Sequence, residues 1–200
     1  MRICEASNGF CSARSKKPGG RLPAIESQRE LSLMLEYGLI FLFPVMVTLA
    51  GVKDLLTFTI PNGIPLALLA GFFLIMGCIG IPWSTFLSHA STGLLVLLIG
   101  FGVFVRGWVG GGDAKLAAAI ALWLGVDNVL AFLLWTAMLG GTLALLLLMY
   151  RRLFPPLWLI CQPWAMRLHD PKEGIPYGVA LAGAGLIVYP HTIWMTGIPG

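Results

Sequence analysis

Two aspartates, Asp54 and Asp113, are the residues of this 200-residue chain whose positions point to chemistry. Each stands at the end of a long apolar stretch, where an ionisable side chain is costly unless it is paired, hydrated or functional. Two carboxylates held close together share one proton, because both cannot ionise easily. Such a pair can hydrolyse a peptide bond: the ionised member takes a proton from the attacking water, and the protonated member polarises the carbonyl. We therefore expect Asp54 and Asp113 to be a catalytic pair.

The other acidic residues beyond position 32 have ordinary explanations. Glu36 begins a helix, where a negative charge suits the helix dipole. Asp127 follows Gly-Val and precedes Asn, which is typical of a turn and a helix cap. Asp170 and Glu173 lie in a polar loop with Lys172. Helix capping is also the alternative interpretation of the two aspartates above, and it is weaker for Asp113 because three glycines precede it.

Composition places most of the chain away from water. Hydrophobic residues make up 58% of the sequence and charged residues only 11%, whereas about a quarter of a soluble domain is charged. No basic stripe is interleaved with aromatics, so nucleic-acid binding is disfavoured. The four cysteines form no CxxC pair, which argues against a zinc ribbon, and we expect neither a metal nor another cofactor.

Apolar runs separated by charges predict an all-α integral membrane fold with about six membrane helices, at 35–53, 62–80, 89–107, 113–126, 129–150 and 176–195. The fourth is short enough to be re-entrant or interfacial. Residues 33–200 then form a single membrane domain. Residues 1–32 are polar and basic and lack periodicity, so we expect a disordered tail.

Basic residues orient these helices, because Lys and Arg are enriched in cytoplasmic loops. One set of loops holds seven of them and the other set none, which puts Asp54, Asp113 and the 151–175 loop on the cytoplasmic side. The basic tail contradicts the outside position that six crossings give it; either it crosses regardless or the native chain starts at Met34. The seven are Lys53, Arg106, Lys115, Arg151, Arg152, Arg167 and Lys172.

Three segments of the sequence are distinctive: Gly110–Leu116, Asp54 with 60–62, and Gly174–Gly178. Together they resemble type IV prepilin peptidases, a family of GxGD aspartic proteases. The run Gly110–Leu116 resembles the family's GxGDxKL motif, Asp54 with 60–62 is similar to its first aspartate motif, and Gly174–Gly178 resembles its IPYG segment. The resemblance covers about 35–195 in the right order. It implies a GxGD-protease-like helical bundle and a catalytic pair with five supporting or substrate-binding residues, which are Gly110, Gly112, Lys115, Pro61 and Asn62.

Within that family the chain resembles the short branch that serves Flp/Tad pili, since it has neither the long cysteine-bearing insertion nor a methyltransferase portion. The resemblance implies removal of leader peptides from prepilin and pseudopilin precursors at the cytoplasmic face of the bacterial inner membrane. Leu56 and Phe58 stand where the family usually has arginines. Lys115 matches the motif's lysine, and a positive-inside anchor is an equally good interpretation of it.

Other classes of function make different demands on the sequence. The chain has no GxSxG and no HExxH, so serine and zinc proteolysis are disfavoured. A presenilin-type protease would share the GxGD element but not the other two segments. A small transporter or channel could use the same two aspartates as a proton relay. A non-catalytic pilus assembly subunit is the third alternative, and it predicts that Asp113→Asn leaves assembly intact.

Overall fold

The computed structural model describes residues 22–79, 81–152, 168–169 and 174–196, and these residues contain helices and no strand. The predicted tail before residue 22 and most of the 151–175 loop, with Arg167 and Lys172, lie outside them. The chain divides into two compact units, Met1–Leu35 and Glu36–Gly200, and the site belongs to the second. The elements are α1 (Leu22–Thr57), α2 (Gly63–Ile79), α3 (Trp83–Val105), α4 (Gly111–Arg152), α7 (Tyr177–Val188), η1 (Tyr189–His191) and α8 (Ile193–Thr196).

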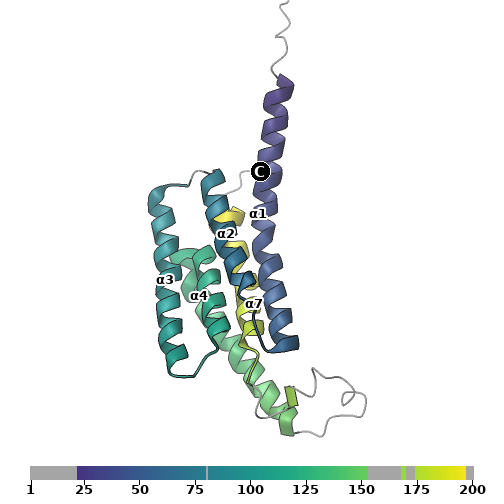
Figure 1. Ribbon diagram of the computed structural model, residues 1–200, viewed down its shortest axis with the longest axis vertical. Helices are drawn as coiled ribbons and strands as arrows, with labels where there is room; N and C mark the ends of the chain where they lie inside the picture. Colours follow the sequence, from purple (N-terminus) through teal and green to yellow (C-terminus); the bar gives the residue numbers. More distant parts are fainter. Residues whose placement is uncertain (1–21, 80, 153–167, 170–173, 197–200) are drawn as a thin grey trace, which may run out of the picture. The chain divides into compact units, whose positions relative to one another are not determined.

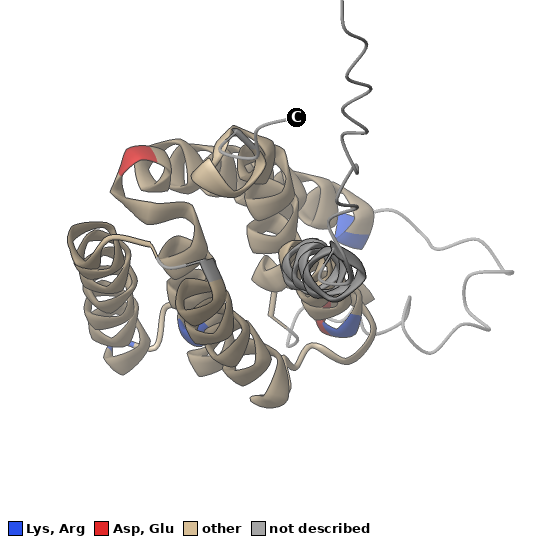
Figure 2. Ribbon diagram, turned by 90° about the horizontal axis from the view of Figure 1, so that it is seen from above, with Lys and Arg blue, Asp and Glu red and all other residues tan. Residues whose placement is uncertain are grey.

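Long apolar helices confirm the predicted all-helical membrane class. Three helical stretches are long and apolar enough to cross a membrane, and Gly63–Cys78 is a shorter apolar helix. With charged residues coloured, nearly all of the described ribbon is uncharged (Figure 2). The count of six crossings stays a prediction. The three stretches are Ile40–Thr57, Trp83–Val105 and Gly111–Arg152.

Helix α4 joins the predicted helices 113–126 and 129–150 into one element, which is bent at Gly125 instead of interrupted by a loop. Gly125 has φ 71° and ψ 178°, a conformation that only glycine adopts readily. The two halves run in opposite directions along α7 (Figure 1). Ile120 packs near Gly185, towards the end of α7, whereas Arg151 donates a hydrogen bond to the carbonyl of Gly174, just before α7 begins. Both ends of α4 therefore lie towards the start of α7.

Two helix boundaries differ from the predicted ones at the first membrane helix. Helix α1 begins at Leu22, earlier than the predicted residue 35, and so includes residues 22–32 of the predicted tail. Glu, Gln, Arg and Leu in this stretch all have high helix propensity. The same helix continues to Thr57, which places Asp54 in its last turn and not beyond its end.

The last predicted membrane helix, 176–195, is shorter in the structure. Helix α7 stops at Val188, and η1 and α8 follow it. Pro190 has no N–H to donate and its ring clashes with the preceding turn, which favours the end of the α-helix at this point.

The core is built around Trp123, which is fully buried in the first half of α4. Its indole Nε1–H donates to the carbonyl of Leu68 in α2 at 2.9 Å, and its own carbonyl accepts from Trp194 Nε1 at 2.6 Å. The ring of Phe43 in α1 lies 5.4 Å from it. A buried indole is stabilised when its N–H has a partner, so this residue fixes α4 against α1, α2 and α8.

Candidate active site

Asp54 lies in the last turn of α1, and the residue that follows the helix has a positive φ. Phe58 has φ 54°, and its N–H donates to the carbonyl of Asp54 at 2.8 Å. The Asp54 side chain is only 5% exposed. Its Oδ2 accepts a hydrogen bond of 2.7 Å from the N–H of Gly178, and the N–H of Val179 also bonds the carboxylate. The carboxylate therefore sits at the positive, N-terminal end of the α7 dipole.

Close packing of α1 and α7 makes this contact possible. A Cβ on Gly51, one turn before Asp54, would lie 2.8 Å from the Cβ of Ala182. A Cβ on Gly178 would lie 2.8 Å from Oδ2 of Asp54 and 2.9 Å from both its Cβ and its Cγ. Because real Cβ contacts are not that short, both positions need glycine for the two backbones to approach.

Asp113 lies in the first turn of α4 and is half-buried. The N–H of Gly110 hydrogen-bonds its carboxylate, and the charge of Asp54 acts on it across the site. The carbonyl of Gly110 accepts the N–H of Ala114 at 3.1 Å, which begins the helix. The structure thus brings the two predicted aspartates, which lie far apart in the sequence, into electrostatic reach of each other.

The other predicted site residues join the same end of the bundle. A Cβ on Gly112 would lie 3.3 Å from the Cβ of Ile60, so the start of α4 packs closely on the connection between α1 and α2. Pro61 is exposed and starts α2 by accepting the N–H of Ile64 at 3.1 Å. Lys115 Nζ donates to Asn62 Oδ1 at 3.0 Å. The glycine-rich and Ile-Pro-Asn segments therefore contact each other directly.

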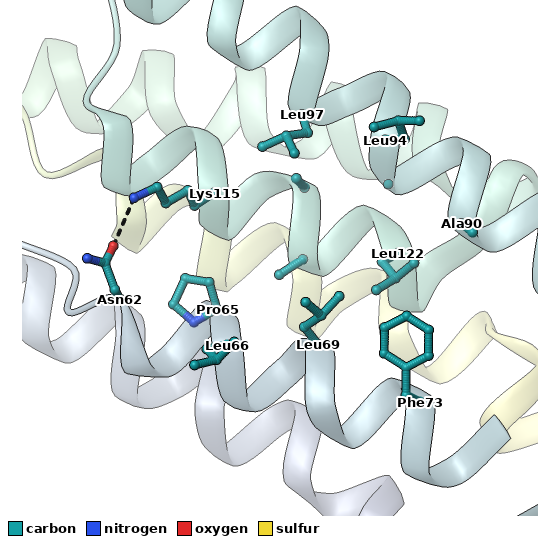
Figure 3. Close-up of a pocket in the computed structure, with 13 residues that line it drawn as sticks. Asn62, Pro65, Leu66, Leu69, Phe73, Ala90, Leu94, Leu97, Lys115 and Leu122 are labelled. Carbon is teal, nitrogen blue, oxygen red and sulfur yellow. Dashed lines mark hydrogen bonds between the residues drawn. The ribbon is translucent and has the colours of Figure 1, made fainter. Parts of the chain in front are cut away.

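An apolar groove of about 480 Å³ runs between α2, α3 and α4. Lys115 and Asn62 stand at one end of it, and Phe73 and Leu122 lie towards the other (Figure 3). Its remaining lining consists of apolar side chains and Gly93. Lys115 follows Asp113 by two residues, so the polar end of this groove lies at the same end of α4 as Asp113, although neither aspartate lines the groove.

The buried histidine His89 lies away from the two aspartates and packs in the core. His89 is buried beside the bend of α4, where its Nδ1 is 2.8 Å from the carbonyl of Leu122 and its ring lies 5.8 Å from that of Phe72. It is therefore a packed core residue of the bend. Among the described residues, no group of three or more His, Cys, Asp and Glu side chains could hold a metal ion.

Sequence reasoning missed the part of α7 that holds Asp54, although it noted the segment. The usable signal was the arrangement of Pro176 immediately before the helix and Gly178 at its second residue, which leaves the N–H groups of the first turn unobstructed. The groove left no comparable signal, because its leucines and alanines look the same in sequence as those that face lipid.

Comparison with known protein families gives a match of this chain to the type IV leader peptidase family over residues 41–145. The match includes Asp54, the 60–62 segment and Asp113, whereas the start of α7 lies outside it. Neither the curated proteins nor the solved structures contain a match to this chain. Since the family match extends over more than half of the sequence, the chain belongs to the type IV leader peptidase family and is a membrane protease with leader peptidase activity.

Proposed function

We propose that this protein is an aspartic endopeptidase that removes the leader peptide of prepilin-like precursors, with Asp54 and Asp113 as its catalytic pair. The observation that supports the proposal is that the charge of Asp54 acts on Asp113, although the two residues lie on different helices. Each carboxylate also accepts a backbone N–H from a glycine. Preorganised groups of this kind are what hydrolysis by a shared-proton pair requires.

The reaction needs one ionised and one protonated carboxyl group. The ionised group takes a proton from water as the water oxygen bonds to the peptide carbonyl carbon, and the protonated group gives its proton to the carbonyl oxygen. The resulting gem-diol then collapses: the C–N bond breaks and the nitrogen takes the proton that came from water. One hydroxyl proton returns to the second carboxyl group, which restores both to their starting states.

The groove offers the substrate a binding place whose polar end lies at the same end of α4 as Asp113. We infer that an apolar stretch following the leader lies between α2, α3 and α4, with the scissile bond near Lys115 and Asn62. In a bilayer the competing contacts are with lipid, so fit to the groove, more than hydrophobicity, selects the substrate.

The proposed topology has six crossings, with the bend at Gly125 dividing α4 into two of them. Basic residues near the end of α1, the end of α3 and both ends of α4 support a cytoplasmic position for the aspartates. We place the protein in the bacterial inner membrane and in the Flp/Tad pilus branch of the family. The basic residues that support this orientation are Lys53, Arg106, Lys115, Arg151 and Arg152.

The test is co-expression with a prepilin-like precursor, read by mass spectrometry. The wild-type chain should reduce the precursor's mass by that of its leader, and Asp54→Asn and Asp113→Asn should each leave the precursor intact. Asp127→Asn is the control, because this exposed carboxylate lies two residues past the bend of α4. Full-length precursor with the wild-type chain would refute the peptidase, and cleavage by either variant at the aspartate pair would refute the assigned residues.

A further inference from the structure

We propose that the N-terminus of α7 is a third element of the catalytic centre, in which Gly178 is a positioning residue that holds Asp54 as the ionised member of the pair. This inference rests on the proposed peptidase function. It assigns a different task to each carboxyl group and gives a role to a glycine outside the segment matched by the family comparison.

Hydrogen bonds distinguish the two carboxylates. Asp54 accepts from Gly178 at 2.7 Å and also from Val179, both in the first turn of a twelve-residue helix. Asp113 accepts from the N–H of Gly110, which lies just before its own helix. Both carboxylates lie at the positive end of a helix dipole, that of α7 for Asp54 and that of α4 for Asp113. Asp54 has two N–H donors and Asp113 one, so Asp54 is the better placed of the two to be ionised.

Asp54 is accordingly the general base, and Asp113 carries the proton at the start of the cycle. Asp54 takes the proton of the attacking water, and Asp113 donates its own to the peptide carbonyl oxygen. When the C–N bond breaks, Asp54 gives its proton to the leaving nitrogen and the gem-diol returns one to Asp113.

Steric contacts at the two glycines also differ. A Cβ on Gly178 would come within 3.0 Å of three Asp54 atoms, including its Cβ, which cannot move without moving α1. A Cβ on Gly110 would come that close only to Oδ2 of Asp113, at 2.9 Å, and its next contact is at 3.7 Å. A side-chain rotation relieves the second clash but not the first. Alanine at position 178 must therefore displace α7 from α1.

The first experiment measures steady-state cleavage of a prepilin-like substrate by the full-length protein in detergent or vesicles. We expect Gly178→Ala to lower kcat by about 10²-fold, because a misplacement of about 1 Å at a catalytic group has that effect. KM should change by less than about threefold, since the groove is untouched. Gly110→Ala should have a smaller effect. Gly183→Ala is the control in the same helix, where a Cβ meets only the end of the Leu139 side chain.

Thermal unfolding supplies a readout that does not depend on activity. Gly178→Ala should lower Tm in the wild-type chain. In an Asp54→Gly background it should not, because the three side-chain atoms of Asp54 that the new Cβ would strike are absent. This cycle also serves if Gly178→Ala alone fails to fold, because the double variant should then recover.

Three outcomes overturn the inference: wild-type kcat in Gly178→Ala, an equal loss in Gly183→Ala, or a Tm change that is the same in both backgrounds. If the wild-type chain cleaves no precursor, the proposed peptidase fails. The unfolding cycle then still decides whether Gly178 positions Asp54.

Discussion

Replacing Gly112 first by alanine and then by valine should lower kcat in two steps. A Cβ at this position would lie 3.3 Å from the Cβ of Ile60 and 3.6 Å from its carbonyl oxygen. Carbon atoms prefer a separation of about 3.5–4.0 Å, so alanine asks for a movement of a few tenths of an ångström. The two additional methyl groups of valine extend the clash to about 1 Å. Because Asp113 is the next residue, the same movement shifts its carboxylate relative to Asp54.

The expected loss in kcat is less than tenfold for alanine and about 10²-fold for valine, on the scale by which misplaced catalytic groups lose activity. Precursor cleavage is followed over time by mass spectrometry, at saturating and limiting substrate, with the amount of folded enzyme measured for each variant. Gly141→Val is the control, since a Cβ there has no neighbour within 4 Å and the residue also lies in α4. Wild-type turnover in Gly112→Val would refute the close approach of α4 to the Ile60 segment as a determinant of the site.

Three further predictions concern other parts of the structure. Leu94→Trp partly fills the groove and should raise KM about tenfold. Leu98→Trp is the control, because Leu98 is similarly exposed but lies outside the groove, and its KM should stay at the wild-type value. Equal KM values for the two variants would refute the groove as the substrate's position. Lys115→Met and Asn62→Leu should each lower kcat/KM by about fivefold and together no further, because both remove one hydrogen bond; additive losses would mean separate roles. Tyr189→Phe removes a buried hydrogen bond to α1 and should cost about 1–2 kcal/mol of unfolding free energy, a few degrees in Tm, with kcat unchanged; an unchanged Tm would contradict that bond.

Local sequence was sufficient for the class of fold and for the candidate aspartates. Apolar runs predicted helices near their observed places, because a membrane helix must satisfy its own backbone hydrogen bonds and a charged side chain within the bilayer is energetically costly. The same rule made Asp54 and Asp113 conspicuous. Where the predicted elements were wrong, a local preference had been misjudged: α1 extends in both directions beyond 35–53, and Pro190 ends α7 early.

Other features depended on contacts between segments that are distant in the chain. The bend at Gly125 turns one helix into two antiparallel halves, and this brings both ends of α4 to the start of α7. The close approach of α1 to α7 brings the N–H of Gly178 to Asp54, and the position of the start of α4 brings Asp113 within reach of the charge of Asp54.

The sequence by itself determined which residues are costly to place in a membrane, since that cost depends on each residue's own charge and its apolar neighbours. Only the tertiary structure decided which of those residues come close to each other and which backbone N–H groups hydrogen-bond their carboxylates. In the sequence, a glycine shows only that a side chain is absent. Its importance at positions 112 and 178 comes from the distance to a second backbone, which no local pattern contains.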